Sequence, residues 1–536
     1  MSAEKDMMPE DTLSPTIANL KNEISSVDPL KEPHMFSHVL YRFLKPRGRP
    51  APRVHLLTIN GLTYPIHRDF GFAAVPDPTE VVRVGDSRLK FNAQRSKRRY
   101  SMLSYLFSMR PGDLVFFFQA DPQYPKKDIL NRRGFRGIWV VASEPFRDVT
   151  TIKHPNTGYE ILGKCPYCNT PFNFGEDRLM KGSRKCLLCG ADYGSVTIGS
   201  ERYSRVVLSA RFLIEPLLVF KKTAGDNRVY SDLVVSPLIW ISRSDNAMGK
   251  GKGSSIRTLL PEEAVKIAFM LATEEHQAID DAEPQPYLGL RQTILDYNGQ
   301  PATLLRAILD NKRGEWVLDH ELYLNLYFAM NVDAPDGPLQ RSLKVPREKI
   351  EWWTTEFPWG YTGDTADFTL TLWDDEMGRF AIYLFEFKKG SIDKKALAEA
   401  LLYVPWVAQV LVNAASYSEE VVLYPVLVGK DCRLRHVPEE HSLELRYVEV
   451  PALNKTIRRR KIAIKPPTIL CYEIRDRDCV ARIKDSVREN EDVCYVKGLD
   501  FVRVDLPPKE FKPLPPSLTT TIVERDFVVR RYMQDF

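Results

Sequence analysis

The chain has 536 residues, and this length predicts three or four domains. Hydrophobic residues make up 44% and charged residues 27% of the chain, a globular composition that excludes a wholly disordered or collagen-like protein. The formal net charge of +5 is too small to indicate a nucleic-acid partner by itself, so the positions of the charges matter more than their sum.

Neither membrane insertion nor secretion is expected for this sequence. It contains no stretch of about 18 apolar residues without a charge, which a transmembrane helix would need. Residues 1–10 are polar and acidic, without the apolar segment of a signal peptide. Four of the eight cysteines form one tight cluster, which in an intracellular protein indicates metal binding. We therefore expect a cytoplasmic protein with no membrane partner.

The first 275 residues predict a flexible tail followed by a small β-barrel. Residues 1–35 are expected to form the tail. Short apolar runs bounded by turn residues then predict strands at 54–59, 113–119, 137–142, 206–212 and 217–221. Helices are predicted at 88–110 and at 261–272, the second with two glutamates in its first turn. Short strands around one helix favour a barrel over residues 36–275.

An insertion at 160–195 carries the clearest metal-binding pattern of the chain. Cys165 and Cys168 form one CxxC pair, Cys186 and Cys189 form another, and 17 residues separate the pairs. Each pair places two thiolates on one tight turn, and two such turns complete a tetrahedron around zinc. The alternative, a redox-active pair, rarely comes with two motifs at this spacing. Four protein ligands leave no position for water, so we expect a structural zinc ion in a four-cysteine ribbon.

The second half of the chain predicts an α/β unit. Residues 276–310 contain acidic residues and prolines and are expected to link this unit to the barrel. Helix, hairpin and helix patterns follow at 321–330, 367–388 and 394–412. These patterns assign 311–430 to one domain and 431–536 to a C-terminal extension. The four later cysteines, between positions 432 and 494, are expected to be core residues or to form a disulfide.

The predicted hairpin brings three charged side chains to one of its ends. If Trp373 faces Phe380 across the turn, Asp367 lies opposite Glu386. Cross-strand partners share one face of a sheet, and Lys388, two residues after Glu386, points to that same face. Because both faces are otherwise apolar, we expect the hairpin to be buried inside an α/β core.

Two carboxylates beside a lysine at a sheet end suit phosphodiester hydrolysis. Asp367 and Glu386 would bind Mg²⁺ or Mn²⁺, and the metal would polarise a scissile phosphate and lower the pKa of an attacking water. Lys388 would position that water or stabilise developing negative charge. The alternative interpretation is a buried ion pair between the lysine and a carboxylate.

This segment resembles the PD-(D/E)XK nuclease superfamily, in which an Asp starts one hairpin strand, an ExK motif ends the next, and an amphipathic helix follows. Residues 385–390 (FEFKKG) and the following helix are similar to the NucS/EndoMS-like branch. The resemblance implies an upstream helical glutamate, for which Glu321 is the match. That branch commonly has a glutamine four residues before the helix tyrosine, where this chain has Glu399 before Tyr403. Pro405 is expected to end or kink the helix.

The N-terminal barrel resembles the EVE branch of the PUA-like fold, over about residues 50–275. The similarity lies in residues 111–118 (PGDLVFFF) and 134–148 (GFRGIWVVASEPFRD), with weaker likeness at 91–95, 205–212 and 253–257. In this interpretation the zinc ribbon is inserted into the barrel. The resemblance implies that the barrel recognises a modified base, which would be flipped into an aromatic pocket.

Two sets of residues are candidates for DNA contacts in the barrel. The candidate base-pocket residues are Asn60, Phe91, Asn92, Phe118 and Gln119. The candidate contacts to the DNA backbone are Arg95, Lys97, Arg98 and Arg99. The alternatives are that the aromatic side chains are barrel core and that the basic cluster is a solvated surface.

The sequence therefore predicts a multidomain α+β protein, with a PUA-like barrel, an inserted zinc ribbon and a PD-(D/E)XK domain. The function that the resemblances imply is that of a modification-dependent DNA endonuclease, which reads a modified base in double-stranded DNA and cuts nearby with Mg²⁺. One active centre per chain favours a homodimer. Two alternatives stay open: a repair endonuclease acting at mismatched or damaged bases, and a non-catalytic binder of modified nucleic acid.

Overall fold

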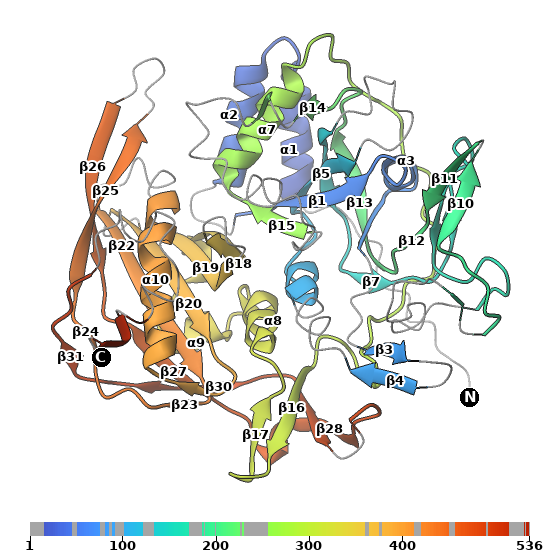
Figure 1. Cartoon of the computed structure of the whole chain (residues 1–536). Helices are drawn as coiled ribbons and strands as arrows, with labels where there is room; N and C mark the ends of the chain where they lie inside the picture. The colour runs from blue at the N-terminus through green and yellow to red at the C-terminus, as the bar shows by residue number, and fades with distance from the viewer. Residues whose placement is uncertain are drawn as a thin grey trace.

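The structure is a computed structural model of the 536-residue chain. It describes residues 15–45, 51–75, 81–84, 88–91, 101–121, 133–170, 185–186, 188–198, 200–225, 228–229, 256–359, 364–374, 378–411, 420–449, 456–488, 491–513, 530 and 532–534. The fold is mixed α+β, as predicted, and two large sheets organise its two halves (Figure 1).

An eight-stranded sheet forms the centre of the N-terminal half. Its main path is β15-β1-β5-β6-β13-β2, with β14 paired to β6 and β7 paired to β13. The strands are β1 (Val54–Asn60), β2 (Phe72–Val75), β5 (Leu114–Asp121), β6 (Gly134–Val141), β7 (Phe146–Arg147), β13 (Ala210–Leu218), β14 (Ala224–Gly225) and β15 (Ile256–Leu259). In the described part of the chain no pairing joins β15 to β2, so closure into a barrel stays a prediction.

Apolar side chains cover both faces of this sheet, which explains why its strands appear in the sequence as continuous apolar runs. Phe116 and Phe118 belong to one hydrophobic cluster, whereas Val115 and Phe117 on the opposite face belong to another. Three helices, α1 (Pro15–Ser25), α2 (Pro33–Leu44) and α7 (Pro261–Ala272), lie together over the first face (Figure 1). The prediction of α7 from its sequence pattern is confirmed at both ends.

The expectation of a flexible tail over residues 1–35 is wrong for residues 15–35. Ile17, Leu20 and Ile24 recur at helical spacing on α1, and all three are buried against the first face. Burial of these three apolar residues stabilises a short helix. Its other residues are mostly polar, which is why the sequence suggested a tail. Residues 1–14 lie outside the described residues.

Short strands and one further helix complete the N-terminal half. They are α3 (Tyr64–Asp69), β3 (Val81–Val84), β4 (Arg88–Phe91), β8 (Ile152–Lys153), β9 (Glu160–Leu162), β10 (Ser195–Ile198), β11 (Glu201–Ser204) and β12 (Val206–Val207). The helix predicted at 88–110 is wrong at its start, because residues 88–91 pair with β3 as an antiparallel strand. Residues 101–106 are helical, and 92–100 lie outside the described residues.

A second eight-stranded sheet forms the C-terminal half. Its main path is β18-β19-β20-β22-β26-β25, and β27 pairs with both β22 and β30. The strands are β18 (Ile350–Trp359), β19 (Asp364–Asp374), β20 (Arg379–Phe387), β22 (Glu420–Gly429), β25 (His441–Glu449), β26 (Thr456–Ile464), β27 (Thr468–Glu473) and β30 (Asp500–Val504). Half of these strands come from residues 431–536, so the boundary predicted at 430 is wrong. The parallel strand β22 needs hydrogen-bonding neighbours on its free side, and β26 and β27 supply them.

Helices cover both faces of the second sheet (Figure 1). Helix α10 (Lys394–Leu411) connects β20 to its parallel neighbour β22, and its Leu397 and Val407 pack on one face. Helix α8 (Leu322–Asn331) packs on the other face through Phe328. Pro405 was expected to end or kink α10, but the helix continues through it to Leu411. Two short helices, α9 (Pro338–Leu343) and the 3-10 turn η2 (Arg347–Lys349), lead into β18.

A four-stranded sheet, β17-β16-β29-β28, lies beside the second large sheet. Its strands are β16 (Leu305–Asp310), β17 (Glu315–Leu318), β28 (Cys479–Lys484) and β29 (Asp492–Val496), and a disulfide joins Cys479 to Cys494. The remaining elements are β21 (Ser391–Ile392), β23 (Asp431–Cys432), β24 (Val437–Pro438), β31 (Pro508–Lys509) and the 3-10 turn η3 (Asp476–Asp478).

The linker predicted at 276–310 is wrong, because this segment is part of the folded body. Residues 305–310 form β16, and Ile294 and Tyr297 are buried. Gln292 exchanges backbone hydrogen bonds of 2.7 and 2.9 Å with Arg147 of the N-terminal sheet. The acidic residues and prolines that suggested a linker therefore belong to an extended segment held by backbone pairing.

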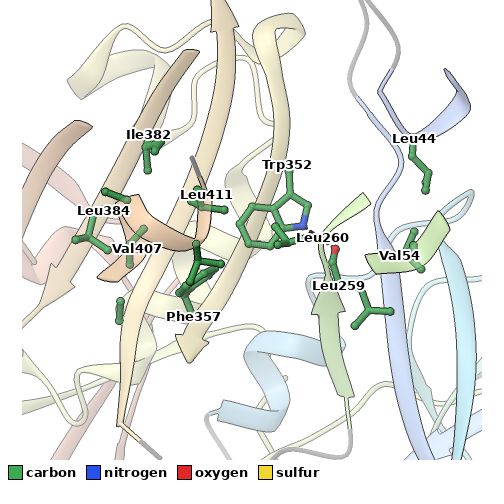
Figure 2. Packing of buried hydrophobic residues seen from close by; sticks show 14 of the residues in the cluster. Leu44, Val54, Leu259, Leu260, Trp352, Phe357, Ile382, Leu384, Val407 and Leu411 are labelled. Carbon is green, nitrogen blue, oxygen red and sulfur yellow. Dashed lines mark hydrogen bonds between the residues drawn. The ribbon is translucent and has the colours of Figure 1, made fainter. Parts of the chain in front are cut away.

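The two halves meet at β18. The indole N–H of Trp352 donates to the carbonyl of Leu259 at 2.8 Å, and the Arg53 guanidinium stacks over the Trp353 ring at 3.6 Å. Figure 2 shows Trp352 between residues of the N-terminal half and residues of α10 and β18. One hydrophobic cluster thus runs through both halves. None of the helices in the described part of the chain has the length and apolar composition needed to cross a bilayer.

Candidate active site and cysteine cluster

The four cysteines of the two CxxC motifs converge on one point. Their sulfur atoms all lie within 4.8 Å of one another. Cys165 Sγ is 3.8 Å from Cys189 Sγ, and Cys168 Sγ is 3.5 Å from Cys186 Sγ. Tetrahedral zinc with Zn–S bonds of about 2.3 Å places its sulfur ligands roughly 3.8 Å apart. The cluster therefore suits a structural zinc ion, as the spacing predicts.

Two matching turns produce this geometry. Asn169 donates its backbone N–H to the carbonyl of Cys165 at 3.0 Å, and Gly190 donates to Cys186 at 2.9 Å. Both donors follow the second cysteine of their motif and have positive φ, 60° for Asn169 and 70° for Gly190. Glycine and asparagine tolerate this left-handed conformation better than other residues. The residue after each CxxC thus closes the turn that points both thiols inward.

The hairpin register predicted from the sequence is confirmed. Trp373 pairs with Phe380, and the ladder continues to Phe368 and Phe385. The next pair in this register is Asp367 with Glu386. Here the ladder ends, and the Asp367 side chain instead accepts a hydrogen bond of 2.6 Å from the backbone N–H of Phe387. The end of the hairpin is therefore where Asp367 meets the strand that carries Glu386.

Lys388 lies between two carboxylates at this end of the sheet. Its ammonium donates to Glu386 Oε1 at 2.6 Å and to Glu399 Oε2 at 2.8 Å. Glu386 is 5% exposed and Glu399 is 7% exposed, so the lysine is held in a largely buried network. Sequence reasoning noted Glu399 only as a departure from the family pattern and missed this contact. A glutamate inside the apolar stretch 396–404 of α10 was the signal that could have revealed it.

Glu321 directly precedes α8 and is half-buried. Its charge is close enough to raise the pKa of both Asp367 and Glu386. The structure thus brings the four residues predicted for catalysis, Glu321, Asp367, Glu386 and Lys388, into one electrostatic neighbourhood. Within the described residues, the cysteine cluster is the one place where three or more metal-ligating atoms lie within 4.8 Å of one another. A magnesium ion here would rest on one or two carboxylates and on substrate oxygens, which is how Mg²⁺ commonly binds.

Burial and neighbouring carboxylates raise the pKa of two carboxyl groups in this cluster. Burial raises the pKa of Glu386 to about 7, with Glu399 and Glu321 adding to the effect and Lys388 opposing it. Burial and the charge of Glu386 raise the pKa of Asp367 well above its ordinary value. Burial opposes the charge of Lys388, but Glu386, Asp367 and Glu399 outweigh this effect and raise its pKa. A bound divalent cation would add positive charge beside these carboxylates.

We expect Glu386→Gln to stabilise the metal-free protein at alkaline pH. Between the ordinary pKa of 4.5 and the folded value of about 7, the folded state holds a proton that the unfolded state has released, so the free energy of unfolding falls as pH rises. Glutamine removes a penalty on the order of 3 kcal/mol at pH 8 and changes little at pH 5. Thermal melting in EDTA at both pH values measures this difference.

The exposed Glu348 supplies the matched control for this measurement. Glu348→Gln should melt like the wild type at both pH values, because its carboxyl is solvated in both states. If Glu386→Gln raised the melting temperature above that of the wild type by as much at pH 5 as at pH 8, the raised pKa of Glu386 would be contradicted. Magnesium should raise the melting temperature of the wild type at pH 8 and should have less effect on the variant.

Three candidate base-pocket residues have structural contacts. Phe118 is fully buried with its ring 5.1 Å from that of Phe135, so it is a core residue. Gln119 is also buried and accepts a hydrogen bond of 2.8 Å from Arg136. Asn60 accepts backbone N–H groups of residues 62 and 63 and so fixes the turn after β1.

For the other residues predicted to contact DNA in the N-terminal half, the structure describes no such side-chain contacts. Phe91 is the last residue of β4. Asn92, Arg95, Lys97, Arg98 and Arg99 lie outside the described residues. The pocket and the backbone contacts predicted in this half therefore stay predictions.

Comparisons with known proteins add no family assignment. No known protein family matches the chain, and no curated protein is recognisably similar to it.

Proposed function

We propose that this protein is a modification-dependent DNA endonuclease that cleaves phosphodiester bonds with the help of Mg²⁺. The observation that carries the proposal is the convergence of Asp367, Glu386 and Lys388 at the end of the β19–β20 hairpin. Two of these groups are carboxylates with raised pKa, a property that clusters at functional sites. The proposed architecture is a PUA-like barrel with an inserted zinc ribbon, joined to a PD-(D/E)XK domain.

Each residue has a separate role in this proposal. Asp367 and Glu386 would hold Mg²⁺ or Mn²⁺, which supplies polarisation of the scissile phosphate when bound. Lys388 would stabilise negative charge on the phosphate as water attacks. Glu399 keeps the lysine extended toward Glu386, because both carboxylates bind the same ammonium. Glu321 would complete the site from the start of α8.

The N-terminal half would supply the recognition of a modified base in double-stranded DNA. Its resemblance to EVE domains supports this role, and the direct contact of β18 with Leu259 ties that half to the sheet that carries the carboxylates. Such a combination would serve to restrict modified foreign DNA. With one active centre per chain, cutting both strands would require two copies, as in a homodimer.

Cleavage assays on a panel of duplexes test the proposal. The full-length protein should cut methylated or hydroxymethylated duplexes in Mg²⁺, should leave plain duplexes largely intact, and should be inactive in EDTA. Preferential cutting of mismatched duplexes would instead identify a repair endonuclease. Binding to modified duplexes without cleavage in Mg²⁺ or Mn²⁺ would refute the nuclease assignment.

A further inference from the structure

A basic groove lies next to the candidate active site. It has a volume of about 580 Å³ and is formed by the β16–β17 hairpin, the turn that follows β20 and the segment that follows β22. Its walls carry five cationic side chains, those of Lys312, Arg313, Lys389, Lys430 and Arg433. Lys389 lies in the FEFKKG segment, and the other four were not singled out by the sequence motifs.

Three of the five cations are already paired with carboxylates. Arg313 and Arg433 share Asp431, and the Arg433 contact is 3.8 Å long. Arg313 also lies 3.9 Å from Asp310, a residue of the groove wall. Lys430 lies 3.7 Å from Glu315. These ion pairs neutralise part of the charge of the groove.

Lys312 and Lys389 supply the excess positive charge. Both side chains are exposed, and neither forms an ion pair with another described residue. Lys389 donates to the carbonyl of Asp319 at 3.3 Å, a contact that positions the ammonium without neutralising it. A groove with two lysines that form no ion pair with another described residue attracts an anionic ligand.

The groove adjoins the carboxylate site through the backbone. Lys389 is the residue after Lys388, and its contact at Asp319 lies two residues before Glu321. Lys430 donates its backbone N–H to the carbonyl of Gly390 at 2.8 Å, and the hydroxyl of Tyr472 donates to the carbonyl of Lys389. The turn after β20 is thus held on both sides by hydrogen bonds, and it places Lys389 of the groove three residues after Glu386.

We propose that this groove binds the phosphodiester backbone of the DNA next to the bond that is cut, with Lys312 and Lys389 contacting phosphates. The inference rests on the proposed nuclease function, because it names the path of the substrate past that site. Lysines contact phosphates through charge, which supplies affinity and register without reading the sequence. The volume of the groove exceeds what a single phosphate ion fills, which favours a polymer backbone.

Binding of a plain, fluorescently labelled DNA duplex in EDTA tests this inference without requiring cleavage. The full-length Lys312→Ala/Lys389→Ala variant should lose about two phosphate contacts. The slope of log affinity against log salt should therefore become shallower by about 1.8. The affinity loss should be similar for every duplex sequence, because the contacts carry no base information.

Lys497→Ala is the matched control, since Lys497 is an exposed lysine that does not line the groove. Its salt slope should equal that of the wild type. An unchanged slope in the double variant, or an equal change in the control, would overturn the inference. Calorimetric titration with inorganic phosphate is a second test. If the double variant loses saturable phosphate binding but its salt slope for DNA is unchanged, the groove binds phosphate alone and the inference is overturned. Loss of the nuclease assignment would appear separately, as cleavage that persists in Glu386→Ala.

Discussion

Asp367→Ala and Glu386→Ala should each reduce Mg²⁺-dependent DNA cleavage by at least about 100-fold while DNA binding persists. Each change removes a carboxylate from the site proposed for the metal. The DNA contacts proposed for the groove and for the N-terminal half come from other residues, so affinity in EDTA should change little. Initial cleavage rates on a susceptible duplex, with binding measured in parallel, test both parts of this prediction.

Lys388→Ala should also lower the cleavage rate, by about 100-fold, because it removes the positive charge that we propose to stabilise the scissile phosphate. Its loss leaves Glu386 and Glu399 buried without the shared ammonium, so the melting temperature must be measured beside the rate. Lys388→Arg preserves the charge and should recover part of the cleavage rate if charge is what matters.

Asp374→Ala is the control for position along the hairpin. Asp374 is the last residue of β19, where it pairs with Lys349 at 3.2 Å and with Arg379 at 3.4 Å. It lies at the opposite end of the strand from Asp367, so its loss should leave cleavage near the wild-type rate. Equal damage from Asp374→Ala would contradict the location of the site. Wild-type cleavage by Glu386→Ala would remove the nuclease assignment.

The candidate site was predictable because its geometry is local. Once Trp373 is set opposite Phe380, the register places Asp367 opposite Glu386. Because side chains alternate between the two faces of a strand, Lys388 then lies on the same face as Glu386. The cysteine turns are local in the same sense, since each CxxC closes a turn of its own. Patterns over a few residues contain enough information for such features.

The parts of the fold and of the site that were not predicted depend on contacts between segments distant in the chain. A short sequence pattern does not contain such contacts. Helix α1 forms because Ile17 and Leu20 find a partner surface. Strand β26 joins β22 in parallel from well beyond the predicted boundary. The contact of Glu399 with Lys388 required knowing how α10 crosses the sheet. The periodicity of apolar residues predicted individual helices and strands. Which of them pack together depends on contacts between segments distant in the chain.

Loss of the cysteine cluster should unfold the ribbon locally and leave the large sheets intact. Among the described residues the hydrophobic cluster around the cysteines is small: Leu162 and Tyr193 are buried beside Cys165 and Cys186. We therefore expect the ribbon to depend on a bound metal for its fold. Zinc binding contributes about 10–16 kcal/mol to small zinc domains, which exceeds what this cluster provides.

Elemental analysis should find one zinc ion per chain in the wild type and should find that ion lost from the Cys186→Ser variant. Proteolysis should then cut within residues 160–170 or 188–198, whereas the circular dichroism spectrum of the whole protein should change little. Cys432→Ser is the matched control, because Cys432 is a partly buried thiol outside the cluster. It should keep its zinc and its resistance to protease. A wild-type protein without zinc would contradict a structural metal site. A Cys186→Ser variant with full zinc content would contradict it as well, because three thiolates hold the ion less well than a closed tetrahedron of four.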